Sequence, residues 1–358
     1  IGSQLALDAL LFSNAHDDPA LHYRVGVALA QLHDEHPDYV IDETRQLEAL
    51  GRRRDYATTL VEPFRDGRAA LGDESLITRV LGDRLDQSME LSFWLLGLRR
   101  DARGLRRAHT LLIGTDARRR AFAMELIDNE LSGEERELVA HHIDEHHRSL
   151  EKGDAERFGS HLLRLCAVDD FVLKACARFV ARRAGLWTAA YREDDMNETV
   201  VKRLFALEGV EIFARSDVDD LAAVAAVARE QTFLKGVQVY GEGDPGDALY
   251  VIVEGAMEAR RDGEVLMRMT SKECFGETSL FDGAPRINEV VATQDSKVLV
   301  IDRRDFLDLL ADRPELLAGM FRVVSRQLKS MVVQVANRRS TGEFETISGP
   351  PVPSERAR

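Results

Sequence analysis

Cysteine is scarce in this sequence, with three residues in a chain of 358. Cys166, Cys176 and Cys274 form no CxxC pair. Small secreted domains rely on dense, even-numbered cysteine frameworks, and this sequence has none. We therefore expect reduced thiols and a cytoplasmic setting.

Long apolar runs are also missing. The longest, over residues 221–228, is far below the roughly 20 residues that a membrane-spanning helix requires, and no signal peptide is visible. The sequence begins at Ile1 and not at methionine. This leaves open that the chain is the cytosolic portion of a longer, membrane-attached protein.

Basic residues are outnumbered, with 48 Lys and Arg against 62 Asp and Glu and a formal net charge of −14. An acidic chain repels phosphate backbones unless it carries a concentrated basic patch, and no long patch is present. The charge balance therefore argues against nucleic-acid binding. Hydrophobic residues make up 44% of the chain, which is ample for the cores of two or three domains.

Residues 1–199 show helical periodicity and essentially no strand-like alternation. Leu91, Leu95 and Leu98, for example, would lie on one face of a helix. Short polar breaks, such as residues 16–19 and 72–74, separate these runs. The pattern predicts an all-α region.

One pattern occurs twice in this region, at residues 116–123 and 170–177. Both copies begin with Asp, followed one turn later by a basic residue and after another turn by Ala. We expect Asp116 and Asp170 to cap helix N-termini and the alanines to let a neighbouring helix approach closely. Such units must stack to bury their apolar faces. The pattern resembles HEAT-type helical repeats, and a non-repetitive helical bundle is the alternative.

From about residue 200 the pattern changes to short β-type runs separated by glycine-rich turns. After a short helix over 217–230, strands are predicted at 231–239, 248–253, 256–260, 265–269, 289–293 and 298–301, followed by helices at 304–310 and 315–339. This spacing predicts a jelly roll or small barrel. The fold class is multidomain α+β: an all-α region over 1–199, a β domain with flanking helices over 200–339, and a disordered tail rich in Pro, Gly and Ser over 340–358.

Two ordered segments of the β-rich region carry the strongest signal. Residues 241–247 read Gly-Glu-Gly-Asp-Pro-Gly-Asp, and residues 275–286 run from Phe-Gly-Glu-Thr-Ser-Leu to Pro-Arg. Over about residues 205–335 the chain resembles cyclic nucleotide-binding domains, and the second segment is similar to their phosphate-binding cassette. The resemblance implies a jelly-roll domain that binds a cyclic nucleotide.

The resemblance also assigns the residues that contact the ligand. Arg286 offers a planar fork of donors to the cyclic phosphate. The backbone N–H groups from Gly276 onward form a nest for the same anion, and Glu277 accepts from the ribose 2′-hydroxyl. The predicted ligand-binding residues are Gly276, Glu277, Thr278, Ser279, Arg286 and Ile287.

The residues after Arg286 depart from the small or hydroxyl side chains usual in the family. Ile287 has no hydroxyl, which removes the feature associated with guanine nucleotides, so cyclic AMP is favoured over cyclic GMP. Asn288 replaces a small residue, and Glu289 brings a carboxylate near the phosphate site. Alternate residues of a strand face opposite sides, so Glu289 faces either the site, where it would repel the anion, or the other side.

Two further motifs occur in the sequence. Residues 241–246 match the dinucleotide fingerprint GxGxxG, but a strand follows them where that motif requires a helix, so we interpret them as a hairpin turn. Of the four histidines between residues 141 and 147, His142 and His146 share one helix face, a spacing that can bind a metal. No third ligand is identifiable, and we predict a solvated polar helix without a metal.

Catalytic motifs are missing from the sequence. It contains no P-loop, no GxSxG elbow and no Cys-based metal pattern. We therefore expect a binding protein that is not an enzyme and uses no cofactor beyond its nucleotide ligand.

The last predicted helix carries an apolar seam at Leu317, Met320, Val324, Leu328, Met331 and Val335. The seam favours either a homodimer through a coiled coil or packing on the chain's own barrel. Related transcription factors continue from this helix into a helix-turn-helix, whereas this sequence continues into the tail. Direct DNA binding is therefore not expected.

Residues 18–32 and 119–129 resemble the helical region of bacterial proteins that join a transporter-like membrane part, similar to ATP/ADP carriers, to HEAT repeats and a cyclic nucleotide domain. This resemblance implies that the chain is their soluble portion. We predict a regulatory sensor that binds a cyclic nucleotide and transmits the signal through its C-terminal helices and helical repeats. The alternative is a scaffold that binds a protein partner through the repeats and carries a non-binding nucleotide fold.

Overall fold

The computed structural model describes residues 19–36, 38–113, 116–131, 133–186, 198–213 and 216–313, together with residues 316, 317, 321, 325 and 329. The chain divides into two compact units. The helical unit contains the chain up to Phe205 and again Asp217–Ala226, and the β unit contains Ala206–Ser216 and the chain from Val227 onward. The predicted tail, and most of the predicted helix over 315–339 with its seam, lie outside the described residues.

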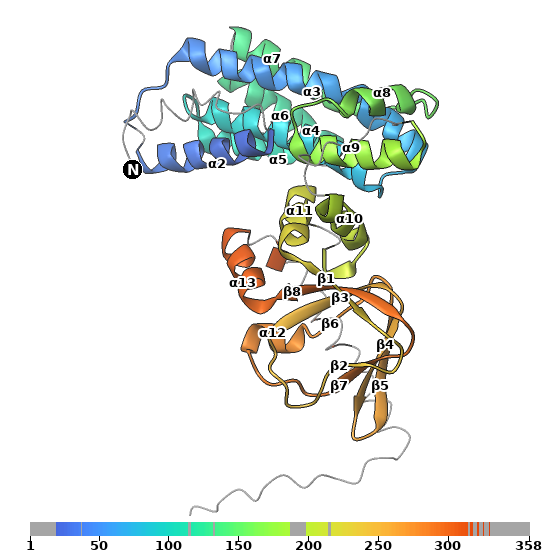
Figure 1. Cartoon of the computed structure of the whole chain (residues 1–358). Helices are drawn as coiled ribbons and strands as arrows, with labels where there is room; N and C mark the ends of the chain where they lie inside the picture. The colour runs from blue at the N-terminus through green and yellow to red at the C-terminus, as the bar shows by residue number, and fades with distance from the viewer. Residues whose placement is uncertain are drawn as a thin grey trace, which may run out of the picture. The chain divides into compact units, whose positions relative to one another are not determined.

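The helical unit follows the predicted all-α pattern (Figure 1). Its helices, the last two of which cross the boundary between the units, are α2 (Pro19–Glu35), α3 (Glu43–Leu71), α4 (Leu76–Gly97), α5 (Ala102–Leu112), α6 (Ala117–Glu130), α7 (Gly133–Ser149), α8 (Phe158–Leu165), α9 (Phe171–Arg183), α10 (Glu198–Leu207) and α11 (Val218–Val227). In the described ranges, no helix combines the length and apolarity that crossing a bilayer requires.

Helix α4 is the centre of this unit, because it packs against α2, α3, α5, α7 and α9. Ile77, Leu81 and Leu96 are fully buried, and burial of such a side chain contributes about 1.5–3 kcal/mol. The approach of α2 is close at Gly26, where a Cβ would overlap Leu91 Cδ1 at 1.9 Å. The apolar circumference of α4 therefore organises the helices around it.

The two predicted aspartate caps are present. Asp116 accepts from two backbone N–H groups of the first turn of α6, and Asp170 accepts from Leu173 N–H at the start of α9. Ala123 and Ala177 are fully buried. Helix α3 also packs against α7 and α8, whereas solenoid repeats contact only their neighbours. The HEAT-like assignment of the region stays a prediction.

The β unit contains two antiparallel four-stranded sheets around one core (Figure 1). One has the order β1 (Arg229–Phe233), β8 (Ser296–Asp302), β3 (Ala248–Glu254), β6 (Cys274–Phe275), and the other the order β2 (Gln238–Tyr240), β7 (Glu289–Ala292), β4 (Ala256–Arg261), β5 (Glu264–Thr270). This is the architecture of a jelly roll. The accompanying helices are η1 (Glu211–Phe213), α12 (Thr278–Asp282) and α13 (Arg303–Asp312).

The structure corrects two details of the predicted strands. The run over residues 231–239 forms two strands, β1 and β2, in different sheets, because the chain turns at Gly236 with φ +85°. The turn over residues 241–246 is not a hairpin, since β2 pairs with β7 whereas β3 pairs with β6 and β8. It is a connection between the two sheets.

Candidate functional site

The cassette begins with a sharp backbone turn after β6. Gly276 has φ +84°, and a Cβ on it would lie 2.7 Å from Arg286 Nη1 and 2.9 Å from the Ala248 carbonyl oxygen. Both the conformation and the lack of space require glycine here. The short helix α12 follows and ends at Gly283 in the left-handed conformation.

Arg286 lies inside the β unit, at 3% exposure. Its Nη1 donates to the Gly276 carbonyl at 2.9 Å and its Nη2 to the Ala248 carbonyl at 2.7 Å. Its Nε is buried without a hydrogen-bond partner. Its ion pair with Asp247, whose side chain is 78% exposed, is long at 3.9 Å. The short contacts of this cation therefore go to neutral groups.

The two sequence segments of the resemblance meet at the backbone of Arg286. Its N–H donates to the Asp244 carbonyl, and its carbonyl accepts from Gly243 N–H, both at 2.8 Å. A Cβ on Gly246 would lie 2.3 Å from Ser279 Cβ. The turn over residues 241–246 thus packs directly against the cassette and holds Arg286 in place.

Two tyrosine side chains lie beside the guanidinium. Arg286 Cζ is 4.4 Å from the centroid of the Tyr240 ring and 5.8 Å from that of Tyr250. Tyr250 stacks on Phe275 with centroids 5.0 Å apart and planes at 4°. Burial raises the pKa of Tyr240, and the Arg286 charge opposes that rise. Sequence analysis missed both tyrosines, whose only signal was an aromatic residue on a core-facing strand position.

Two further cassette residues are buried. Glu277 is 7% and Ser279 4% exposed, and Thr278 Oγ1 donates to Glu277 Oε1 at 3.3 Å. Burial, and next the Glu277 charge, raise the pKa of Cys274 to about 12. The cassette thus buries the Glu277 carboxyl as well as the Arg286 guanidinium.

The residues after Arg286 turn outward. Ile287 is 54% exposed. Val290 and Ala292 face the core at 0% and 1% exposure, so alternation places Glu289 on the opposite face of β7, where its cross-strand neighbour is Arg260. Because Arg286 Cζ lies over the ring of Tyr240, a member of the core, Glu289 does not face the arginine side.

With this geometry in place, comparison with known proteins identifies the domain. Residues 230–313 match the family model of the cyclic nucleotide-binding domain. The chain carries a cyclic nucleotide-binding domain. This agrees with the resemblance found in the cassette.

Several of the matched proteins are regulators by name. A CRP-like cAMP-activated global transcriptional regulator of Mycobacterium tuberculosis is 33% identical over 123 residues, which cover 33% of this chain and 55% of the regulator. A cAMP-dependent protein kinase regulatory subunit of Hypocrea atroviridis is 29% identical over 138 residues, covering 38% of this chain and 28% of the subunit. The solved N-terminal domain of a transcriptional regulator from Streptomyces coelicolor is 34% identical, with a TM-score of 0.32. The match covers 35% of this chain and 94% of that domain. The chain spans about half the length of the first regulator and about a quarter of the kinase subunit.

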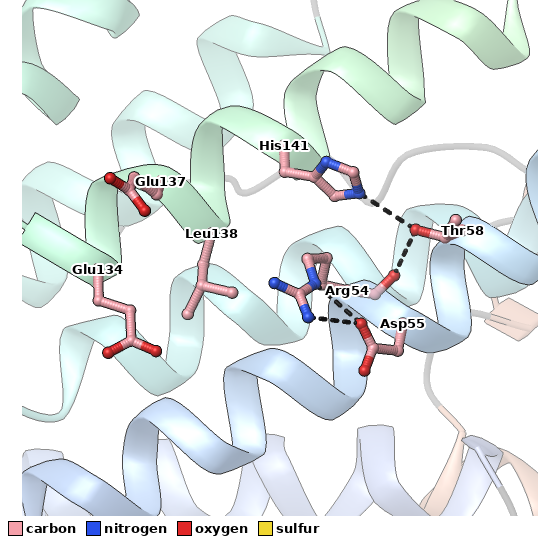
Figure 2. A pocket seen from close by; sticks show the side chains of 7 residues that line it. All are labelled: Arg54, Asp55, Thr58, Glu134, Glu137, Leu138 and His141. Atoms are coloured by element: carbon pink, nitrogen blue, oxygen red, sulfur yellow. Dashed lines mark hydrogen bonds and ion pairs between the residues drawn. The ribbon is translucent and has the colours of Figure 1, made fainter.

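A hollow in the helical unit lies between α3 and α7 (Figure 2). Arg54 pairs with Asp55 at 2.7 Å, and His141 lies 3.2 Å from Thr58 Oγ1. Figure 2 shows His141 directed at Thr58, with Glu134 and Glu137 extending from α7. The polar groups of this open hollow largely contact one another.

The histidine cluster of α7 is only partly solvated. His142 is 4% exposed and lies 3.4 Å from the hydroxyls of both Ser88 and Ser92, and burial lowers its pKa to about 4. The prediction of a solvated helix is therefore wrong for His142, because this face of α7 packs on α4. Across the described ranges, no group of three or more potential metal ligands occurs.

Proposed function

We propose that the β unit binds a cyclic nucleotide, with cyclic AMP preferred over cyclic GMP, and that the chain is a regulatory sensor and not an enzyme. The phosphate contacts Arg286 and the backbone of residues 276–279, and the ribose 2′-hydroxyl contacts Glu277. The observation that carries the proposal is the buried guanidinium of Arg286, whose Nε has no hydrogen-bond partner.

Arg286 is suited to an anion because its charge is incompletely neutralised. A buried guanidinium is unfavourable unless it is paired and hydrogen-bonded. Its two short hydrogen bonds go to carbonyl groups and its Nε has no partner. A guanidinium has five N–H donors, so Arg286 can donate to a phosphate oxygen without breaking either carbonyl contact.

The nucleotide preference rests on Ile287, which has no hydroxyl to offer a guanine base. We expect Ile287→Thr to raise the affinity for cyclic GMP relative to that for cyclic AMP. The ratio of the two dissociation constants tests this, and an unchanged ratio would contradict it.

Transmission of the signal rests on chain connectivity. Only Ala228 separates α11 from β1, and β1 is two strands from β3, whose Ala248 carbonyl accepts from Arg286. We propose that nucleotide binding shifts α11 through β1 and so changes how the helical repeats bind a protein partner.

Calorimetric titration of the chain with cyclic AMP and cyclic GMP is the test. We expect micromolar or tighter binding of cyclic AMP that is lost in Arg286→Ala and weakened in Arg286→Lys, which keeps the charge but not the fork. Arg261→Ala is the matched control, because Arg261 is 53% exposed and pairs with exposed Glu242. Circular dichroism verifies that each variant is folded. Failure of the folded wild-type chain to bind would contradict the proposal.

The scaffold alternative is favoured by one observation: Arg286 is buried and donates to two carbonyls of its own domain, as a purely structural arginine does. In that case the domain binds no nucleotide and Arg286→Ala only destabilises it. The titration therefore separates the two functions.

A further inference from the structure

The side chain of Tyr240 lies against the guanidinium of Arg286, the group proposed to bind the phosphate. Tyr240 ends β2 and is 8% exposed, and its ring centroid lies 4.4 Å from Arg286 Cζ. The Tyr250 ring belongs to the other sheet and lies 5.8 Å from the same atom. The guanidinium is therefore placed against aromatic side chains from both sheets.

We propose that Tyr240 is a positioning residue for anion binding, which holds the Arg286 guanidinium by its flat face and leaves the N–H edges for the phosphate. This inference rests on the proposed nucleotide function. Aromatic rings attract a cation over their face, and a guanidinium stacks on them while its donors still point outward in its own plane. An ammonium group has no such plane.

The hydrogen bonds of Arg286 agree with edge-on binding. Two donors at the end of the fork meet the carbonyls of Gly276 and Ala248, which fixes the direction of the fork within its plane. The Tyr240 ring fixes the tilt of that plane. The unpartnered Nε–H then lies in a set direction, along the side edge of the fork. Because this donor is already held in place, the Arg286 side chain loses less conformational entropy when an oxyanion binds.

The phenol hydroxyl is not needed for this role. The ring face makes the contact, so Tyr240→Phe keeps it and Tyr240→Leu removes it. Phe233 is a matched control, because it belongs to the same core at 7% exposure. Phe233→Leu thus creates a similar cavity on a different strand.

Calorimetry on the full chain with cyclic AMP, in a double-mutant cycle, tests the proposal. We expect Tyr240→Leu to weaken binding about tenfold, and Tyr240→Phe and Phe233→Leu less than about threefold. In an Arg286→Lys background the effect of Tyr240→Leu falls below about threefold, because the ammonium does not stack. A full tenfold effect of Tyr240→Leu in the Arg286→Lys background, or no effect in the wild-type background, would overturn the proposal. Equal losses of affinity in Tyr240→Phe and Tyr240→Leu would overturn it too, because they would assign the role to the hydroxyl.

A second readout needs no nucleotide. In the proposed arrangement the Arg286 Nε–H proton lies over the face of the Tyr240 ring, whose centroid is 4.4 Å from Cζ, and the ring current there shifts its NMR resonance upfield. We therefore expect this resonance to move downfield in Tyr240→Leu and to stay in place in Phe233→Leu. An unmoved resonance would overturn the proposal. If the folded wild-type chain binds no nucleotide, the proposed function fails, and this resonance still decides whether Tyr240 holds the guanidinium.

Discussion

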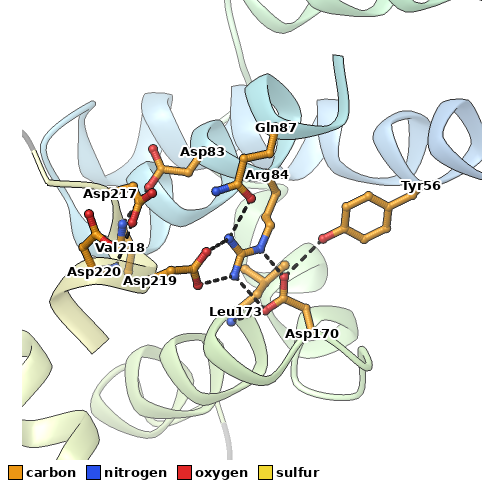
Figure 3. Close-up of polar contacts among 10 residues, drawn as sticks. All are labelled: Tyr56, Asp83, Arg84, Gln87, Asp170, Leu173, Asp217, Val218, Asp219 and Asp220. Carbon is orange, nitrogen blue, oxygen red and sulfur yellow. Dashed lines mark hydrogen bonds and ion pairs between the residues drawn. The ribbon is translucent and has the colours of Figure 1, made fainter. Parts of the chain in front are cut away.

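Arg84 of α4 holds Asp219 of α11 through two parallel hydrogen bonds, Nη1 to Oδ2 at 2.6 Å and Nη2 to Oδ1 at 2.8 Å (Figure 3). Its Nε also donates to Asp170 Oδ2 at 2.5 Å. Asp170 in turn caps α9. One arginine at 1% exposure thus joins three helices of the helical unit, including the one that leads into β1.

Replacement of Arg84 should be severely destabilising. Arg84→Met leaves the Asp170 and Asp219 carboxylates without their shared cation, and removal of one member of a buried ion pair costs about 3–5 kcal/mol. Urea unfolding followed by tryptophan fluorescence reports on this unit, because Trp94 lies in α4. Arg54→Met, which breaks the surface pair with Asp55, should cost less than about 1 kcal/mol. Equal losses for the two variants would contradict the central role of Arg84.

Asp83 should make the helical unit less stable as the pH rises. Its Oδ2 accepts from Val218 N–H at 2.9 Å. Burial raises its pKa from 3.8 to about 7, against that hydrogen bond, while Asp217 adds to the rise and Arg79 and Arg84 oppose it. The folded state therefore keeps a proton that the unfolded state releases, and stability falls between about pH 4 and pH 7.

Asp83→Asn isolates this effect because its amide oxygen still accepts from Val218. We expect the variant to be about 1–3 kcal/mol more stable than the wild type at pH 8 and equally stable at pH 4. Asp86, whose pKa burial raises to about 6, acts in the same direction but is present in both proteins. A variant that is less stable than the wild type at pH 8 would contradict the prediction.

His142 should act in the opposite direction. Burial, and next the charges of His141 and Arg53, lower its pKa from 6.5 to about 4. The unfolded chain binds a proton there before the folded chain does, so stability falls as the pH drops from 6.5 towards 4. At pH 4.5 the loss is about 2 kcal/mol and should be absent in His142→Asn. His147→Asn, at an exposed position of the same helix, should keep the loss.

Gly276 should tolerate no side chain. Gly276→Ala imposes a methyl group on Arg286 Nη1 and on the Ala248 carbonyl at a positive φ, so we expect a stability loss of about 1–3 kcal/mol and at least about tenfold weaker cyclic AMP binding. Gly263→Ala is the control, since Gly263 has φ +80° but open space around it. It should lose stability through the backbone alone and keep its affinity. Comparable affinity losses in both variants would contradict the prediction.

The backbone turn of the cassette could be predicted because its pattern is local in sequence, whereas its ligand contacts stay a prediction. A glycine, an acidic residue and an arginine within twelve positions indicate an anion site wherever the chain folds into the matching turn. Alternation along β7 could not decide the direction of Glu289, because the register of a strand depends on its partners. Pairing of β7 with β4 and β2 sets it.

Helix caps were likewise predictable, since an aspartate reaches only the N–H groups of the next turn. The Arg84 cluster was not, because its partners lie 86 and 135 residues away. The same holds for His142, which is buried because α7 packs on α4, and for Tyr240, whose ring lies against a residue 46 positions later.

The sequence by itself determined the helical and β-rich regions, the aspartate caps and the backbone turn at Gly276, because periodicity, capping and turn chemistry act within a few residues. Only the tertiary structure decided which face Glu289 takes, that the turn over residues 241–246 joins two sheets, and that Tyr240 and Arg84 lie against their partners. These features depend on contacts between segments far apart in the chain, and packing of whole elements brings those segments together.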